Sequence, residues 1–326
     1  MGKIKKVVLV NVYAYFGGTL AISKLCAELR KQQVDARLLM VPYFPDKPID
    51  TAVFKKEVKT CILKNRIKKG IMKIFPFMDY SKNKRFKHLA YFPIDGVRFE
   101  YSADIDDETL VVYPEIVYGN PLGAKNVARW LLYHYKFENT PEAYRNDDLF
   151  ICYRTYFNSP ALNPKEITVT INHFDDKLYR QYNFAQRTGN CYILRKGRKR
   201  ADLPVKFDGP VFDDNMTQEE LVKMFNSCKY CYDYDTQTFY VSIAAVCGCI
   251  PIVVMESGKT IDDYLTKSER NHYGIAYGNS PEQIEYAERT REKLLEKLDF
   301  SERNHKSTLA FIEAVEERFG QIKRMK

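Results

Sequence analysis

Residues 228–254, with the sequence CKYCYDYDTQTFYVSIAAVCGCIPIVV, constrain the fold of this chain more than any other stretch. Residues 229–232 are β-prone and end in a polar loop, which predicts a short strand followed by a sharp turn. The small residues from Phe239 onward suit a helix packed closely on a sheet, until Gly248 ends it. Residues 250–255 are wholly apolar, as expected of a strand buried on both faces of a parallel sheet. The stretch therefore predicts a βαβ unit.

The loop of this unit, residues 233–237, lies at the carboxyl end of its first strand. Open α/β sheets bind ligands at that edge, where a helix N-terminus offers free N–H groups and a positive dipole end to phosphate. Thr236 and Thr238 are placed to add hydroxyl donors, so the sequence favours an anion site here. A structural βαβ unit without a ligand is the alternative.

The chain has 326 residues, which is enough for two domains with separate cores. It has no run of about eighteen apolar residues, and no small-residue cleavage site follows the apolar N-terminal run, which predicts a cytoplasmic protein. Its eight cysteines are then expected to be reduced. Four of them, Cys228, Cys231, Cys247 and Cys249, have a zinc-like spacing, but they flank apolar strands and a buried helix. Buried thiols without a metal are the favoured interpretation.

The N-terminal part predicts a second βαβ-like opening. Residues 6–11 predict a strand, a tight turn with Gly17 and Gly18 follows, and a helix runs to about Gln32 before a strand at 36–41. The two glycines let the backbone approach a ligand without an intervening Cβ, although a plain turn is the alternative. The sequence lacks GxGxxG, so neither a nicotinamide nor a flavin cofactor is supported.

Residues 55–87 form a strongly basic segment. Twelve Lys or Arg residues stand there against two acidic residues, a net +10, while the whole chain carries +9. Apolar residues recur at helical spacing, which predicts a basic amphipathic helix suited to an anionic membrane surface. Nucleic acid is the competing partner, but no nucleic-acid-binding motif is present. A core helix with a solvated basic face is the other alternative.

The middle of the chain offers two candidate catalytic residues. Residues 109–117 predict a strand that contains Glu115 near its end, and residues 125–134 predict a helix. Burial would raise the pKa of the Glu115 carboxyl, which makes it a candidate general base; capping of nearby N–H groups is the alternative.

Strands are also predicted at 149–157 and 166–172, and residues 178–187 are expected to link the two domains. His173 follows the second of these strands beside two carboxylates, which makes it a candidate catalytic residue with an unknown partner.

The second domain is predicted to open with a strand at 191–194 that runs into the basic turn 195–200, RKGRKR. Arg195 and Lys196 at a strand end could clamp a diphosphate, since Arg offers a bidentate fork; a solvated basic turn is the alternative. Residues 217–220 form a capping box, which predicts the start of a helix.

Three pieces of the chain together resemble GT-B glycosyltransferases, the nucleotide-sugar enzymes built from two Rossmann-like domains. They are residues 228–254, residues 111–133 (VVYPEIVYGNPLGAKNVARWLLY) and residues 273–278 (YGIAYG). The similarity is nearest to transferases that build bacterial surface polysaccharides. In that family two acidic residues stand eight apart before a Cys-Gly pair; here Asp235 occupies the first position and Ile243 the second, so one carboxylate is missing.

The resemblance implies an α/β fold of two Rossmann-like domains facing across a cleft. Residues 1–180 would bind the acceptor, with a basic insertion at 55–87; residues 181–300 would bind the nucleotide sugar; and residues 301–326 would form a helix that returns to the first domain. It further implies transfer of a hexosyl or deoxyhexosyl group, without a metal cofactor, to a lipid-linked glycan for capsule or lipopolysaccharide, on the inner face of the cytoplasmic membrane.

The resemblance also implies roles for individual residues: Arg195 and Lys196 at the diphosphate, Phe212 and Asp213 at the nucleobase, Tyr234, Thr236, Gln237 and Thr238 at the donor, Gly17 and Gly18 at the cleft, and Asp235 at the family's first acidic position. Asp235 therefore joins Glu115 and His173, which were singled out by their places at strand ends, as the candidate catalytic residues.

Two other functions fit parts of the sequence. Asp104-x-Asp106 and Asp233-x-Asp235 both spell the DxD motif of metal-dependent GT-A glycosyltransferases, although the two-domain pattern speaks against that class. Activity that survives a chelator would separate the two. A non-catalytic protein that binds polyanions or membranes is the third possibility, and it predicts no nucleotide-diphosphate binding.

Overall fold

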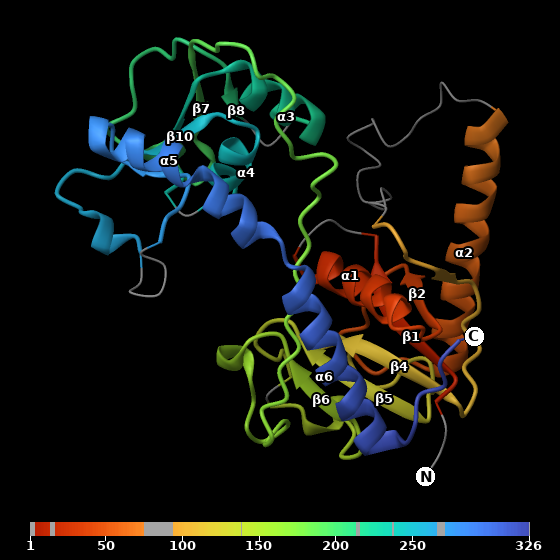
Figure 1. Ribbon diagram of the computed structural model, residues 1–326. Helices are drawn as coiled ribbons and strands as arrows, with labels where there is room; N and C mark the ends of the chain where they lie inside the picture. The colour runs from red at the N-terminus through yellow and green to blue at the C-terminus, as the bar shows by residue number, and fades with distance from the viewer. Residues whose placement is uncertain are drawn as a thin grey trace. The chain divides into compact units, whose positions relative to one another are not determined.

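The computed structural model describes residues 4–13, 17–74, 94–137, 139–212, 216–236, 238–265 and 271–325. Its contacts divide the chain into two compact units, Met1–His173 with Phe300–Lys326, and Phe174–Asp299. Each unit contains one parallel sheet with helices, which confirms the predicted α/β class (Figure 1). The domain boundaries expected from the sequence were 180/181 and 300/301.

The first unit holds a six-stranded parallel sheet in the order β3-β2-β1-β4-β5-β6. Its strands are β1 Lys6–Val12, β2 Ala36–Val41, β3 Phe99–Glu100, β4 Thr109–Pro114, β5 Asn126–Leu131 and β6 Leu149–Cys152. The order is that of doubly wound dinucleotide-binding folds, and it reverses between β1 and β4.

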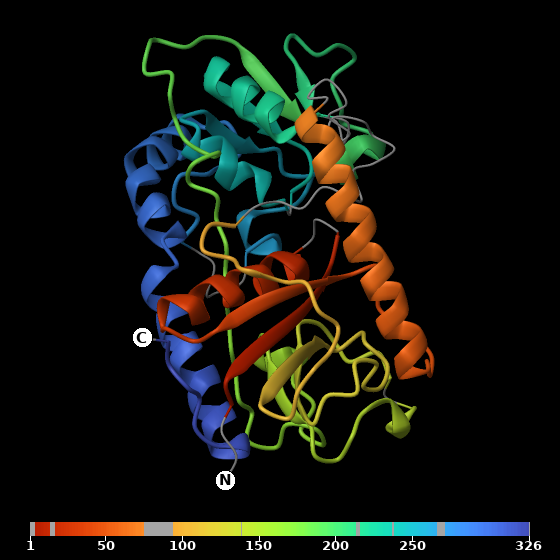
Figure 2. The same ribbon diagram turned by 90° about the vertical axis from the view of Figure 1, so that its right-hand side faces the viewer.

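Helices cover both faces of this sheet (Figure 2). They are α1 Gly17–Lys31 and α6 Ser301–Phe319 on one face, and α2 Thr51–Ile74 on the other. Because side chains alternate along a strand, Leu9 packs with Leu25 and Phe311 on the first face, while Val8 packs with Phe54 on the second. The helix α6 thus completes the core of the first unit, although it is far away in sequence.

The second unit holds a five-stranded parallel sheet in the order β11-β10-β9-β7-β8. Its strands are β7 Asn190–Ile193, β8 Val211–Phe212, β9 Tyr230–Asp233, β10 Ile250–Val253 and β11 Ala276–Tyr277, and its helices are α3 Gln218–Ser227, α4 Tyr240–Val246 and α5 Pro281–Leu298. The predicted capping box starts α3, since Thr217 accepts from the Glu220 N–H and Glu220 accepts from the Thr217 N–H. Gly248, with φ +83°, follows α4 as expected.

Three local predictions were wrong. Residues 125–134 form strand β5 and its exit, not a helix: Val127 packs into one face of the core and Trp130 into the other, so the apolar run is that of a fully buried strand. Residues 166–172 form only a single bridge, between Thr168 and Cys152. Gly17 and Gly18 are the first residues of α1 and not a tight turn.

In the part of the chain that the structure describes, no helix combines the length and apolarity that crossing a membrane requires.

Candidate functional site

In the second unit, the order in which successive strands join the sheet reverses between β7 and β9. Strand β8 lies on one side of β7, whereas β9, β10 and β11 follow one another on the other side. This order corresponds to the flavodoxin-like arrangement, in which ligands bind outside the carboxyl ends of the two strands at the reversal. Ile193 pairs with Asp233, and the Tyr234 N–H donates to the Ile193 carbonyl at 2.8 Å. The residues that follow the two strands therefore share one edge of the sheet.

The basic turn after β7 is a 3-10 helix, Arg195–Lys199. Arg195 has a φ of +28°, a backbone conformation that costs energy for any residue with a Cβ and that is often found at functional sites. Its guanidinium lies 5.0 Å from the ring centroid of Tyr240, while Lys196 is exposed. A Cβ added at Gly197 would lie 2.1 Å from the Tyr234 carbonyl oxygen, so only glycine lets the turn approach the loop after β9 this closely.

Arg200 ends this turn and has a structural role that the sequence did not reveal. Its guanidinium donates to the Val254 carbonyl at 2.6 Å and to the Tyr234 carbonyl at 3.4 Å, and it pairs with Asp202 at 2.6 Å. It therefore ties the exits of β9 and β10 to the basic turn, and its charge is balanced within the protein.

Two carboxyl groups lie at the exit of β9. Asp233 is 0% exposed and Asp235 is 3% exposed, and the Asp235 N–H donates to Asp233 Oδ1 at 3.0 Å. Within the described chain, the Oδ2 atom of each is buried without a hydrogen-bond partner. Burial, followed by the nearby charge of Asp235, raises the pKa of Asp233 to about 8. Because buried polar atoms nearly always have partners, these two oxygens are suited to contact a ligand.

The other predicted donor contacts that the structure describes belong to the same unit. Thr238 Oγ1 accepts from the Tyr240 N–H at 3.4 Å just before α4, whose N-cap residue is Phe239, and Thr236 is half-buried in the loop. Phe212 ends β8 with its ring 4.7 Å from that of Tyr240, and the guanidinium of Arg200 lies over the Tyr234 ring. Two further predicted positions, Asp213 and Gln237, lie outside the described residues.

The first unit has its own reversal point, between β1 and β4. Glu115 follows β4 there and is 4% exposed, and its Oε2 accepts from the Leu132 N–H at 3.0 Å. Burial raises the pKa of Glu115 to about 7, as its position in the sequence predicted. The alternative of N–H capping is observed as well. Gly17 opens the helix after β1, and an added Cβ there would meet no atom of the described residues within 4 Å, so those residues leave room for a ligand beside its backbone.

A buried ion pair fixes the loop that follows Glu115. Arg129, within β5, pairs with Asp148 at 2.9 Å, and both side chains are 0% exposed. The guanidinium of Arg129 also donates to the carbonyls of Val117, at 2.9 Å, and Gly119. Arg129 was not predicted from the sequence, although a charged residue inside an apolar segment indicates a buried ion pair.

His173 is the residue after which the chain leaves the first unit, and it is half-buried. The preceding residue, Asn172, is held by Asn304 of α6 through two hydrogen bonds of 2.9 and 2.8 Å. This arrangement fixes the backbone before His173, whose catalytic role stays a prediction.

The predicted site residues thus form two groups, one in each unit. Gly17, Gly18, Glu115 and His173 belong to the first, and the residues of the basic turn, β8 and the loop after β9 belong to the second.

Of the two DxD sequences, the first has carboxylates that interact with nearby side chains of the protein. Asp104 pairs with Lys59 at 2.9 Å, and Asp106 accepts from the Thr109 hydroxyl at 2.6 Å. Across the described residues, no group of three or more His, Cys, Asp or Glu side chains is arranged to hold a metal ion.

No protein-family model matches the sequence, and no curated protein matches it. Solved structures with similarity to the chain include a glycotransferase of kitacinnamycin, with 10% identity, TM-score 0.34, and coverage of 98% of this chain and 97% of that one. A spinosyn forosaminyltransferase has 13% identity, TM-score 0.30, and coverage of 94% and 100%. The sucrose-phosphate synthase of Thermosynechococcus elongatus has 10% identity, TM-score 0.35, and coverage of 97% and 95%. These TM-scores are too low to support an argument, so the α/β fold of the chain is established by the two parallel sheets described above.

Proposed function

We propose that this chain is a glycosyltransferase that binds a nucleotide sugar at the carboxyl edge of the second sheet. One observation carries this proposal: the basic turn and two buried carboxyl groups both follow the carboxyl ends of the paired strands β7 and β9. Phosphate oxygens only accept hydrogen bonds, so they suit Arg195 and Lys196. Sugar hydroxyls both donate and accept, so they suit the Oδ2 atom of Asp235 and that of Asp233, whose raised pKa keeps it protonated at neutral pH. A nucleotide sugar carries both kinds of group.

The chemistry proposed for this site needs no bound metal. The departing nucleoside diphosphate would be stabilised by Arg195 and Lys196 together with backbone N–H groups. Asp235 would orient a sugar hydroxyl, and Phe212, at the end of β8, would lie beside the nucleobase.

The first unit would bind the acceptor. With its pKa near 7, Glu115 is partly ionised at neutral pH and is suited to take a proton from an acceptor hydroxyl. The sequence resemblance supports a bacterial cell-surface glycan, lipid-linked and destined for capsule or lipopolysaccharide, as the acceptor, and a hexosyl or deoxyhexosyl group as the sugar moved.

The phosphate clamp is tested by Arg195→Ala. We expect binding of the cognate nucleoside diphosphate, chosen by calorimetry from UDP, GDP, CDP and TDP, to weaken by about 1.5–3 kcal/mol, since a charge-assisted hydrogen bond is lost. Lys199→Ala removes an exposed cation from the same turn and serves as the control, with an expected change below about 0.5 kcal/mol. Equal affinities in the two variants would remove Arg195 from the site. If none of the four nucleotides binds to the wild-type protein, the transferase proposal fails.

We further propose that α2 docks on the inner face of the cytoplasmic membrane. Phe54 and Val58 fix its first turns in the core, whereas Leu63 and Ile67 are 59% and 53% exposed. Exposed cations accompany these two residues: Lys59, Lys64, Arg66 and Lys68. Apolar side chains among cations suit the boundary of an anionic bilayer. Residues 75–87 of the predicted basic segment lie outside the described residues.

Vesicle sedimentation tests this surface. Binding should require anionic lipid and should weaken with salt, because the Debye length is about 10 Å at 0.1 M ionic strength. Replacing both Leu63 and Ile67 by Asp should abolish binding, whereas Leu309→Asp, at an exposed apolar position of α6, should leave it intact. Equal binding to neutral and anionic vesicles would show that the basic face is not the determinant.

A further inference from the structure

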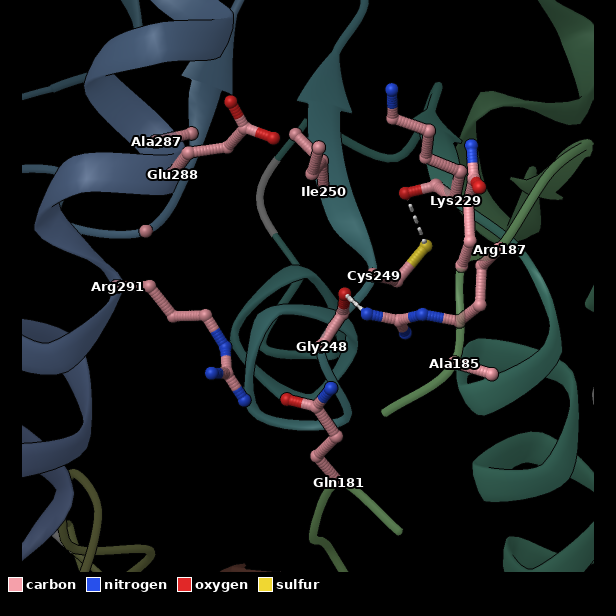
Figure 3. Close-up of a pocket in the computed structure, with 12 residues that line it drawn as sticks. Gln181, Ala185, Arg187, Lys229, Gly248, Cys249, Ile250, Ala287, Glu288 and Arg291 are labelled. Carbon is pink, nitrogen blue, oxygen red and sulfur yellow. Dashed lines mark hydrogen bonds between the residues drawn. The ribbon is translucent and has the colours of Figure 1, made fainter. Parts of the chain in front are cut away.

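A pocket of about 360 Å³ lies within the second unit, at the sheet edge opposite the proposed nucleotide site (Figure 3). Lys229 and Cys249, which line it, directly precede β9 and β10, so the pocket is at the amino ends of these strands. Its volume is within the range of small-ligand sites. The proposed nucleotide site, by contrast, lies at their carboxyl ends. We call this second cavity the amino-edge pocket.

Two arginines line the amino-edge pocket and are held by backbone carbonyls at the end of α4. Arg187 donates to the carbonyls of Cys247, at 3.2 Å, and of Gly248. Arg291, from α5, donates through Nε to the Ala245 carbonyl at 2.6 Å and through NH2 to that of Val246 at 2.8 Å. These contacts fix both guanidinium groups and satisfy the last carbonyls of α4. They use only part of the five N–H donors that each guanidinium has.

In the described part of the chain, no ion pair with a carboxylate balances the charge of Arg187 or of Arg291. Burial, followed by the nearby charge of Arg187, lowers the pKa of Arg291, and the charge of Glu292 only partly offsets this. Lys229 adds a third cation, and Glu288 is the one carboxylate among the residues that line the pocket. Three cations against one anion leave an excess of positive charge in a partly enclosed space, which favours an anionic ligand.

The floor of the pocket is built around Gly248. With φ +83°, this residue occupies a backbone region that favours glycine. An added Cβ would lie 2.5 Å from Cδ of Gln181 and 2.7 Å from NH2 of Arg187. The Gln181 amide and the Arg187 guanidinium are thus close to each other over a bare backbone, and Figure 3 shows both of them, with Arg291, around Gly248.

We propose that the amino-edge pocket binds a small phosphate-bearing anion, a phosphate monoester or a diphosphate, through Arg187, Arg291 and Lys229. Phosphate oxygens match the planar fork of a guanidinium, and two forks that already have fixed orientations lose little freedom on binding. This site is separate from the β7–β9 edge, so it stands or falls independently of the glycosyltransferase proposal.

Calorimetry of the full chain with pyrophosphate tests the site. Pyrophosphate should bind to the wild-type protein and should still bind when Arg195 and Lys196 are both replaced by Ala, because the basic turn at the opposite edge is not involved. Loss of all binding in that double variant would assign the anion to the basic turn and overturn the proposal, as would a wild-type protein that does not bind pyrophosphate.

Gln181→Glu is the decisive variant, because it places a carboxylate beside Arg187 without a change of shape. We expect pyrophosphate binding to weaken at least about tenfold, as the new carboxylate takes the place of the ligand. Gln181 Nε2 also donates to the Asn183 carbonyl at 3.0 Å, a bond that Glu loses, so circular dichroism of the variant without ligand should accompany the titration and should show an unchanged fold. Gln32→Glu in the first unit makes the same change of net charge and should leave binding unaltered.

Lys229→Gln provides a second variant at an exposed position, where folding is not at risk. It should weaken pyrophosphate binding and reduce its salt dependence, since one cation is lost. Unchanged pyrophosphate affinity in both Gln181→Glu and Lys229→Gln would overturn the proposal.

Discussion

Asp148→Ala should lower the free energy of unfolding by about 3–5 kcal/mol, because it leaves the buried guanidinium of Arg129 without its counter-charge. Both side chains are 0% exposed, and the pair distance is 2.9 Å. Arg129 also holds the carbonyls of Val117 and Gly119, so the loop after Glu115 should loosen at the same time. Urea denaturation at neutral pH, followed by circular dichroism, measures the loss.

The adjacent residue provides a matched control. Asp147 pairs with Arg145, but both are substantially exposed, so Asp147→Ala should cost no more than about 1 kcal/mol. Burial raises the pKa of Asp148 in spite of Arg129, which shows that removal from water opposes the charged state of this carboxyl. Replacing both partners by apolar residues, Arg129→Met with Asp148→Leu, should therefore recover much of the loss. Similar losses for Asp147→Ala and Asp148→Ala would contradict the proposed role of the buried pair.

The helix ends that the sequence predicted correctly are marked by particular residues at those ends. Thr217 and Glu220 mark the start of α3, and Gly248 marks the end of α4, because a cap or a positive φ depends on neighbours in the chain. Strand β5 has no such mark. Its residues are buried on both faces, so they show neither the period of a strand nor that of a helix, and the helix expected at 125–134 was wrong.

The candidate nucleotide site was only partly predictable, because its residues meet through strand order. The rule that ligands bind at carboxyl ends of parallel strands singled out Arg195 and Asp235 separately. Which strands lie side by side depends on pairing between distant segments, and the sequence does not show that β7 pairs with β9. The burial of Asp233 and the structural role of Arg200 follow from that pairing, so both were missed.

The cysteines illustrate the same limit. The sequence grouped Cys228, Cys231, Cys247 and Cys249, and all four are free and buried, as the preference for buried thiols predicted. In the structure, however, the thiol in contact with three of them, Cys228, Cys231 and Cys249, is that of Cys191, which lies directly opposite Cys231 on β7. The spacing of the cysteines in the sequence could not indicate this contact, since it depends on the pairing of β7 with β9.

Asp233→Asn should change how stability depends on pH. The pKa of Asp233 is about 8 in the folded protein and near its ordinary value of 3.8 when unfolded, so the folded state keeps a proton that the unfolded state has released. The stability that this proton contributes is complete below about pH 4 and is lost as the pH rises towards 8. The free energy of unfolding of Asp233→Asn, measured by urea denaturation, should therefore rise relative to that of the wild type between pH 5 and 8, by up to about 1.4 kcal/mol for each pH unit.

Asp208→Asn is the control for this measurement. Asp208 is exposed, and its hydrogen bond from the Tyr192 hydroxyl lowers its pKa, so it is ionised in both states over the same pH range. Its difference from the wild type should stay constant with pH. If Asp233→Asn also differs from the wild type by a constant amount, Asp233 is ionised throughout.

The same proton affects ligand binding at the β7–β9 edge. A carboxylate next to a diphosphate is repelled by it, whereas a protonated carboxyl is not and can also donate a hydrogen bond to a ligand oxygen. Affinity of the wild-type protein for the cognate nucleoside diphosphate should therefore fall above about pH 8, where Asp233 ionises. In Asp233→Asn, which is neutral at every pH, the affinity should stay level. If the affinities of the two proteins depend on pH in the same way, the diphosphate does not bind near Asp233, because ionisation of a neighbouring carboxyl would weaken its binding.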